Sequence, residues 1–192
     1  MSRVSWVKIV TDSEASGNVK EMYDAVRHKG DVENLYLACS AFPTPISTAD
    51  KLYKAIMHAT NGPLCSWECE MAATYVAILT NCRYAIMHHG TNFIHYYDDQ
   101  QAAKKILDLL EQNEIAEFLQ PQHKAILAYS RKLTLSPEDL EETDIVILRQ
   151  SGLDDSQIVH LNQVVSNFNY WIRVINGLGI TLGKTPIGLD FE

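Results

Sequence analysis

Apolar residues along this 192-residue chain recur at helical spacing, and no stretch shows the sustained alternation that a half-buried strand requires. Helix start and stop signals divide this pattern into short segments. The chain carries nine glycines and six prolines, few for an all-β protein with many tight turns. The sequence therefore predicts an all-α bundle of about eight helices joined by short loops.

Capping and breaking residues set the expected helix limits. In the first part of the chain, one helix is expected from about 17 to 30 and a second over 34–42. A third is expected to begin at a cap at Ser47 or Thr48 and to end at 61–63. The next two are expected over 67–80, after a cap at Ser66, and over 82–97. In the second part, helices are expected after a cap at Asp98 or Asp99, over 121–133, from Ser136-Pro137-Glu138 to Gly152, and from Asp154 or Asp155 to Asn176, with Gly177 as the stop.

The composition predicts one globular domain over residues 1–192, with an apolar N-terminal arm over 1–16. The formal net charge is −8, and the chain has no block of lysines or arginines. A nucleic acid or a membrane surface is therefore not expected as a partner. No apolar run approaches the roughly 18 residues of a membrane span. The first ten residues lack a signal-peptide pattern, and four cysteines are not a disulfide framework. We expect a soluble cytoplasmic protein with reduced thiols.

The residues best suited to chemistry lie in the segment 64–90. In a helix that begins near Cys82, His89 lies seven positions later and about 20° away on the helical wheel, so the two side chains share a face. His88 is about 120° from Cys82 and is expected to be structural or at the surface. Phe93 lies on the same side as His89 and is a candidate to line a pocket beside it.

Glu70 lies twelve positions before Cys82, which on one continuous helix would place it about 120° off that face. A break at residues 80–81 would let the two halves fold against each other and bring Glu70 toward Cys82 and His89. Free N–H groups and the helix dipole stabilise a thiolate at a helix N-terminus, so the thiol pKa of Cys82 is expected to be low. His89 can then move a proton and Glu70 can orient it.

These residues also have structural interpretations. Cys82 can be a small buried residue, and Glu70 can be held by a buried hydrogen bond, including one to His89. Cys65 and Cys69 form a poor metal site, because no histidine pattern lies nearby. Either thiol is also a candidate to form a disulfide with an oxidised Cys82. No cofactor and no metal ion are expected.

The segment resembles the core motif of the alkylhydroperoxidase D and carboxymuconolactone decarboxylase superfamily. In the peroxidase branch the motif is Glu, eleven residues, Cys-x-x-Cys, three residues and His, which Glu70, Cys82 and His89 match. Residues 136–155 and 167–179 resemble later segments of the peroxidase-related subgroup. The family's CxYCxxHHG run has its counterparts in Cys82, Tyr84, Ala85, His88, His89 and Gly90.

The resemblance implies an AhpD-like helical fold and a homo-oligomeric, antioxidant oxidoreductase, but the chain departs from the motif at one position. Ala85 replaces the cysteine that attacks the hydroperoxide in the peroxidase branch, and Cys82 matches the partner that resolves it as a disulfide. Tyr84 stands where some members carry a relay histidine. A two-cysteine cycle within the motif is therefore impossible in this chain. We take Tyr84, Ala85, His88 and Phe93 as candidates for the pocket or the relay.

Three functions follow from the residues and the resemblance. The first is a one-cysteine peroxidase, in which Cys82 reacts with a hydroperoxide, Glu70 and His89 relay protons, and an external thiol is the reductant. The second is an acid–base enzyme of the decarboxylase or lyase type, in which His89 and Glu70 move protons on a small organic acid or lactone. The third is a non-catalytic homo-oligomeric binding module. The resemblance to the peroxidase-related subgroup favours the first.

Overall fold

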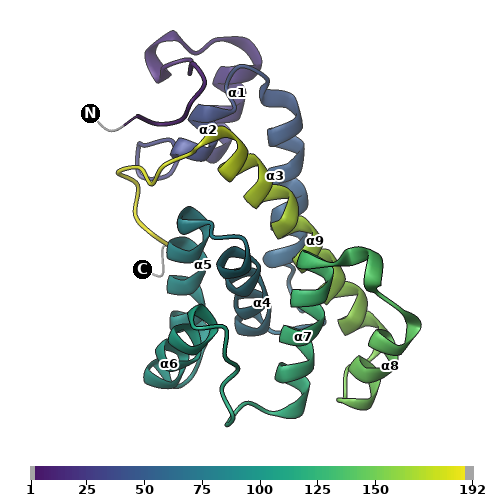
Figure 1. Ribbon diagram of the computed structural model, residues 1–192. Helices are drawn as coiled ribbons and strands as arrows, with labels where there is room; N and C mark the ends of the chain where they lie inside the picture. Colours follow the sequence, from purple (N-terminus) through teal and green to yellow (C-terminus); the bar gives the residue numbers. More distant parts are fainter. Residues whose placement is uncertain (1–2, 189–192) are drawn as a thin grey trace.

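The computed structural model describes residues 3–188, which form nine α-helices and no strand (Figure 1). Within these residues the nearest approach to β-structure is an isolated bridge between His28 and Asp31. The all-α prediction is confirmed. The helices are α1 Gly17–Val26, α2 Asn34–Ala38, α3 Pro43–Met57, α4 Ser66–Leu79, α5 Arg83–Tyr96, α6 Gln100–Glu111, α7 Pro121–Leu135, α8 Glu142–Gln150 and α9 Asp155–Leu178.

Helix α4 lies at the centre of the larger part of the molecule (Figure 1). It packs against α5, α7 and α9, and α6 contacts both α4 and α5. Every residue of α4 from Glu68 to Ala77 is buried, because apolar and small side chains occupy all faces of this helix. The prediction that residues 67–80 are deeply buried is confirmed for 68–77, whereas Trp67 and residues 78–80 are half-buried.

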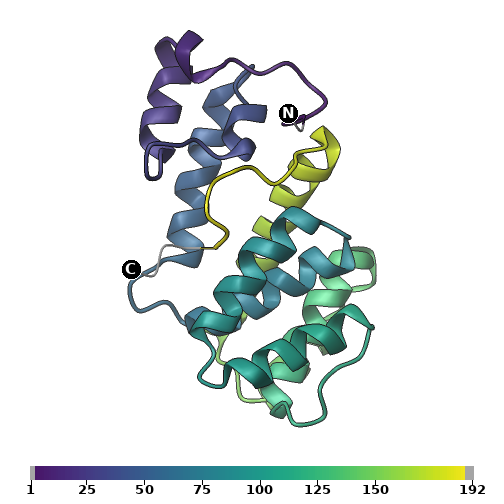
Figure 2. The same ribbon diagram turned by 90° about the vertical axis from the view of Figure 1, so that its left-hand side faces the viewer.

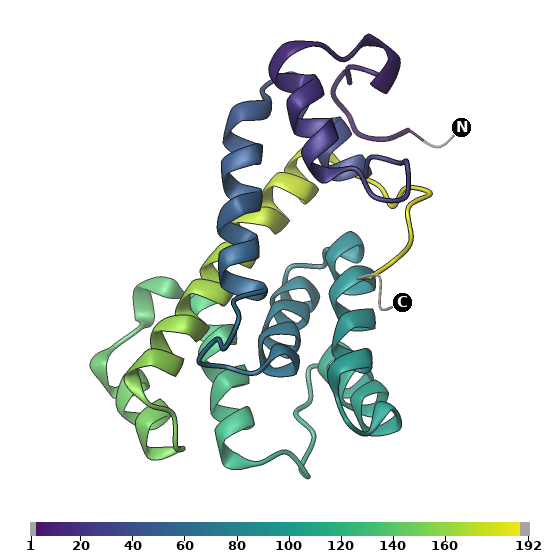
Figure 3. The same cartoon turned by 180° about the vertical axis from the view of Figure 1, so that it is seen from behind.

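Helices α3 and α9 pack against each other, and the end of α9 reaches the region of α1 and α2 (Figure 3). This region has a hydrophobic cluster of its own, around Met22, Tyr23 and Trp171, whereas the main core surrounds α4. Tyr53 on α3 packs against both clusters. The part of the fold between the two clusters therefore brings residues of α3, α5 and α9 near one another.

The chain after α9 runs back toward α5 (Figure 2). Thr181 N–H donates to the carbonyl of Val4 at 3.0 Å, which pairs this segment with the N-terminal arm. Further along, Gly188 N–H donates to His88 Nδ1 on α5 at 3.3 Å. Residues 179–188 thus connect the N-terminal arm to the helix that carries His89. Residues 1 and 2 of the predicted arm lie outside the described residues.

The start of α3 differs from the prediction. The helix begins at Pro43 rather than after a cap at Ser47 or Thr48, and the expected helix over 34–42 ends at Ala38. Proline is favoured at the first helical position because its fixed φ suits a helix and its missing N–H would have no partner there. The Ser47 hydroxyl donates to the carbonyl of Pro43 at 3.3 Å inside the first turns.

Several other helix limits also differ from the prediction. Ser136-Pro137-Glu138 opens a short 3-10 turn over Pro137–Asp139, and α8 begins only at Glu142, where the Asp144 carboxylate accepts from Glu141 N–H. Helix α9 passes through Gly177 and ends before Gly179, whose φ of +58° is the left-handed conformation that glycine favours after a helix. Cys65, not Ser66, is the N-cap of α4, and α1 and α3 end earlier than expected, at Val26 and Met57.

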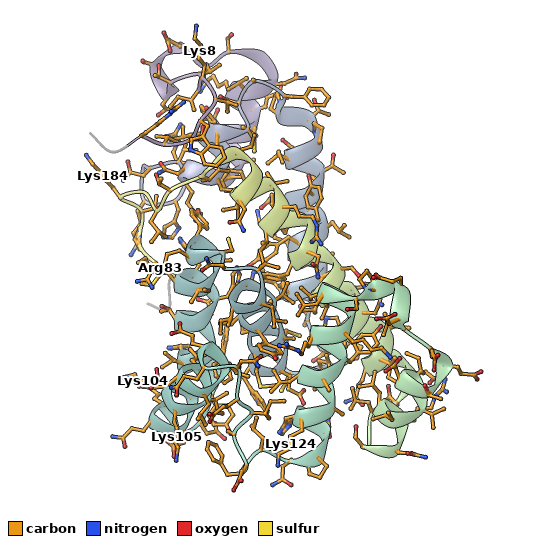
Figure 4. All side chains as sticks on the ribbon, in the orientation of Figure 1. Lys8, Arg83, Lys104, Lys105, Lys124 and Lys184 are labelled. Atoms are coloured by element: carbon orange, nitrogen blue, oxygen red, sulfur yellow. The ribbon has the colours of Figure 1, made fainter. Side chains whose placement is uncertain are left out.

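The described part of the chain has no helix that is long and apolar enough to cross a bilayer. Figure 4 labels six of the basic residues, and their side chains point outward at separate places from the top to the bottom of the view. These labelled residues are Lys8, Arg83, Lys104, Lys105, Lys124 and Lys184.

Candidate functional site

The turn between α4 and α5 creates the site. Leu79 ends α4, Asn81 adopts a left-handed φ of +53°, and Cys82 N–H donates to the carbonyl of Ala77 at 2.9 Å. Asparagine tolerates this conformation better than most residues because its short polar side chain can bond locally. The predicted break is confirmed, and the two helices it separates pack against each other.

Glu70 and His89 form a hydrogen-bonded pair across these helices. His89 Nδ1 lies 2.7 Å from Glu70 Oε2, and Asn92 Nδ2 donates to Glu70 Oε1 at 3.1 Å. The Glu70 side chain is 2% exposed. A carboxylate at Glu70 accepts from Asn92 and, when His89 carries its proton on Nδ1, from His89 as well. In that neutral tautomer of His89, Nε2 is the acceptor nitrogen.

His89 borders a cavity of about 350 Å³. The cavity lies between α3, α5 and α9, and residues 185–188 close part of it. From α5 it is lined by Tyr84, Ala85, His88, His89 and Asn92. Its volume is within the usual range for a small-molecule site, and its wall combines aromatic rings with many polar and charged side chains, among them Arg27, Asp50 and Lys54.

Cys82 is placed differently from its predicted role. Its side chain is fully buried, and it is absent from the described residues that line the cavity. Burial raises the thiol pKa of Cys82, although hydrogen bonds from the backbone N–H groups of Ala85 and Tyr84 act in the opposite direction. The expectation of a lowered thiol pKa is therefore wrong, because the cost of burying the thiolate exceeds the stabilisation that the helix N-terminus provides.

The neighbouring motif residues do line the cavity. Tyr84 donates its hydroxyl hydrogen to Glu33 Oε2 at 2.7 Å, and the His88 ring stacks on the Tyr84 ring with centroids 4.7 Å apart. Burial lowers the pKa of His88. Ala85 presents its methyl group where the resemblance would place the attacking thiol. Tyr84 and His88 are thus held by other protein groups on the cavity wall.

Phe93 is not among the described residues that line the cavity, contrary to the sequence expectation. It is fully buried and packs between Trp67 and Tyr97, with ring centroids 6.5 and 5.5 Å away. The aromatic ring beside His89 is instead Phe168 of α9, whose centroid lies 4.5 Å from that of His89 in an edge-to-face arrangement. Phe93 lies one turn further along α5 than His89, where Trp67 of α4 and Tyr97 pack against it.

Several residues of the site were not singled out from the sequence. Asn92 lies three positions after His89, so helical spacing alone could have placed it on the same face. Tyr53, on α3, has its ring centroid 6.2 Å from that of His89 and lines the cavity. Phe168 and Trp171 line it from α9. No local pattern links these residues to the motif, because the packing of α3 and α9 alone brings them there.

Cys65 and Cys69 lie at the start of α4, away from the described lining of the cavity. Cys65 Sγ donates to Glu68 Oε2 at 3.0 Å, and Cys69 Sγ lies 4.0 Å from His160 Nε2. Cys65 is exposed, whereas Cys69 is buried, and burial raises the pKa of the Cys69 thiol to about 12. Within residues 3–188, no group of three or more His, Cys, Asp or Glu side chains is arranged to hold a metal ion.

Comparisons with known proteins identify the fold. No family model matches the chain, and no curated protein sequence matches it. Among solved structures, an uncharacterized peroxidase-related protein with an alkylhydroperoxidase AhpD core, from Ralstonia eutropha JMP134, has a TM-score of 0.80 at 18% identity, covering 96% of this chain and 95% of that one. An uncharacterized peroxidase-related protein from Silicibacter sp. TM1040 has a TM-score of 0.76 at 21% identity, covering 95% and 94%.

The debrominase Bmp8 also has this fold, with a TM-score of 0.68 at 13% identity over 94% of this chain and 92% of that one. These identities are too low to transfer an activity, but the likeness covers nearly the whole chain. The chain has the AhpD-like all-α fold that the sequence predicts.

Proposed function

We propose that this protein is an acid–base enzyme that acts on a small organic acid or lactone, with His89 as the proton-transferring group. The observation that carries the proposal is the position of His89. Its Nδ1 is tied to the buried carboxylate of Glu70 at 2.7 Å, while the same ring borders the cavity. A histidine held in one tautomer by a carboxylate has its other nitrogen available as a base.

The chemistry follows from the charges of the pair. When His89 Nε2 takes a proton from a carbon next to a carbonyl group, the ring becomes an imidazolium, and the Glu70 carboxylate stabilises that charge. In a decarboxylation, His89 Nε2 first takes the proton of the substrate's carboxylic acid group and becomes an imidazolium. The bond between carbon and carboxylate then breaks, carbon dioxide leaves, and the electron pair passes into the neighbouring carbonyl. The imidazolium gives its proton to the carbon, which returns His89 to its neutral form.

The position of the thiol weighs against the one-cysteine peroxidase. A peroxidatic cysteine needs an accessible thiolate, whereas Cys82 is fully buried, its thiol pKa is raised and it does not appear in the described cavity lining. Ala85, which does line the cavity, has no thiol to offer. The acid–base mechanism needs neither residue to react, and it uses the groups that face the cavity.

The test is a substrate panel in deuterated water, followed by proton NMR. The panel consists of β-keto acids and carboxylated γ-lactones, with loss of carbon dioxide and exchange of carbon-bound hydrogen as readouts. We expect Cys82→Ser to keep the wild-type rate and His89→Ala to lose about 100-fold or more. Consumption of tert-butyl hydroperoxide that depends on Cys82, with no reaction on the panel, would overturn the proposal in favour of the peroxidase.

A further inference from the structure

The proposed function uses His89 as the base, and it also requires a hydrogen-bond donor for the carbonyl oxygen of the substrate. Taking a proton from carbon leaves negative charge on the carbonyl oxygen, and a protein donor at that oxygen stabilises the charge. Glu70 is already engaged with both Asn92 and His89. The donor must therefore come from another part of the cavity wall.

Three tyrosines line the cavity, and two of them use their hydroxyl hydrogens within the protein. Tyr36 donates to Asp50 Oδ1 at 2.7 Å, and Tyr84 donates to Glu33 Oε2 at 2.7 Å. The third, Tyr53, has ring contacts with His58, His89 and Phe168. Within residues 3–188 its hydroxyl has no hydrogen-bond partner. Tyr53 is thus the lining tyrosine whose hydroxyl is left for a bound molecule.

The fold places Tyr53 beside the base, and both residues line the cavity. Tyr53 comes from α3, whereas His89 comes from α5, and the Phe168 ring of α9 packs against both rings, with centroids 6.3 Å from Tyr53 and 4.5 Å from His89. Figure 3 shows α3 and α9 side by side, with α5 across from them. The centroids of the Tyr53 and His89 rings are 6.2 Å apart. A flat group of a few atoms that enters the cavity can therefore meet both.

We propose that Tyr53 is a catalytic residue that donates its hydroxyl hydrogen to the substrate oxygen while His89 moves the proton at carbon. The inference rests on the proposed function. In the forward step, His89 Nε2 accepts the proton from carbon, the electron pair of that C–H bond moves toward the carbonyl, and the resulting enolate oxygen accepts a hydrogen bond from the Tyr53 hydroxyl, which keeps its proton. In the return step, the His89 imidazolium reprotonates the carbon and the carbonyl is restored.

The surroundings keep the Tyr53 hydroxyl in the donor form. Burial raises the pKa of Tyr53 well above that of an ordinary phenol, and the charges of Glu70, Glu33 and Asp50 act in the same direction. The Tyr53 hydroxyl is thus a donor without a protein acceptor on a residue that lines the cavity, and a ligand with an acceptor atom would satisfy it.

The experiment uses 4-nitrophenolate as a probe of an enolate oxygen and measures its binding to the full-length protein by absorbance titration. The variants are Tyr53→Phe and, as matched controls, Tyr36→Phe and Tyr84→Phe, which remove the hydroxyls already bonded to carboxylates. We expect Tyr53→Phe to weaken binding about 10- to 100-fold and each control to change it about twofold or less. Circular dichroism confirms that each variant is folded.

The outcomes separate this inference from the proposed function. Equal binding by the wild type and Tyr53→Phe, or no binding by the wild type, would overturn the role of Tyr53. The panel reaction with β-keto acids then distinguishes the two ideas. If His89→Ala abolishes that reaction and Tyr53→Phe leaves its kcat unchanged, His89 is the base but Tyr53 is not the donor to the substrate oxygen. If His89→Ala leaves it unchanged, the proposed function itself fails.

Discussion

His89 Nδ1 lies 2.7 Å from Glu70 Oε2, and this hydrogen bond joins α5 to the centre of α4 across the turn at Asn81. The Glu70 side chain is 2% exposed and that of His89 is 14% exposed, so the pair is largely shielded from water, and His89 lines the cavity. An isolated charge would be costly in this position. The pair therefore has a structural role beside its proposed chemical one.

The first prediction concerns stability. Replacing His89 with Ala leaves the Glu70 carboxylate buried without its main partner, which we expect to lower the free energy of unfolding by about 3–5 kcal/mol. Urea denaturation followed by circular dichroism measures the change. The matched control is His95→Ala, the same substitution on the exposed side of α5, for which a much smaller change is expected. Equal losses for the two variants would contradict the role of the pair.

The second prediction compares two phenylalanines of similar burial. Phe168 packs edge-to-face on the His89 ring, whereas Phe93 packs between Trp67 and Tyr97. Substitution by Leu at either position should lower stability by about 1 kcal/mol or somewhat more. Only Phe168→Leu should also reduce the panel reaction, by about tenfold or more, because it frees the His89 ring from its fixed orientation. A similar loss of rate in Phe93→Leu would show that the effect is general loosening of the core.

The third prediction restores a thiol on the cavity wall. Ala85→Cys places a thiol beside His89 and three residues from Cys82, so the variant should consume tert-butyl hydroperoxide in the presence of dithiothreitol. The new thiolate takes one oxygen from the hydroperoxide to give a sulfenic acid, which Cys82 converts to a disulfide and water. We expect about tenfold more consumption than by the wild type. The same substitution combined with Cys82→Ser should not cycle through this disulfide.

The fourth prediction concerns alkaline pH. Burial raises the pKa of Cys39 to about 11 and is the main cause that raises that of Cys69 to about 12. Above about pH 9 an unfolded chain loses these thiol protons while the folded chain keeps them, so stability is fully present below that pH and falls as the pH rises. Each thiol should contribute a loss of up to about 1.4 kcal/mol per pH unit until its folded pKa is reached.

Urea unfolding at pH 8 and pH 10, with a reductant present, measures this loss. The double variant Cys39→Ala/Cys69→Ala should be less stable at pH 8, because it leaves cavities, but its stability should depend less on pH than that of the wild type. An unchanged pH dependence in the double variant would contradict the assignment of the alkaline loss to these two thiols.

Much of the fold could be predicted from the sequence because its signals are local. Helical spacing and the break at Asn81 place Glu70 and His89 on facing helices, and the structure brings them into contact. The beginning of α3 differs from the prediction because two competing start signals, Pro43 and Ser47, lie only four positions apart. A local pattern does not show which of two neighbouring residues begins a helix when the conformation of the preceding loop determines it.

The chemistry of the site was harder to predict because it depends on distant packing. The helix N-terminus at Cys82 favours a thiolate, yet the residues that bury this thiol come from other elements of the fold and reverse the direction of the pKa shift. Tyr53 and Phe168 are 36 and 79 positions from His89, so no spacing rule connects them to it. Their approach follows from the packing of α3 against α9, which the sequence alone does not specify.

The central claim is that His89 presents an unprotonated Nε2 to the cavity while Nδ1–H is bonded to Glu70. Nitrogen-15 NMR of the protein with labelled histidines tests it most directly, with His89→Gln used to assign one ring among the seven. We expect the neutral His89 ring to carry its proton on Nδ1, and we expect Glu70→Gln to change the signals of this ring more than those of the other histidines. A His89 ring protonated on Nε2, with signals insensitive to Glu70→Gln, would contradict the account.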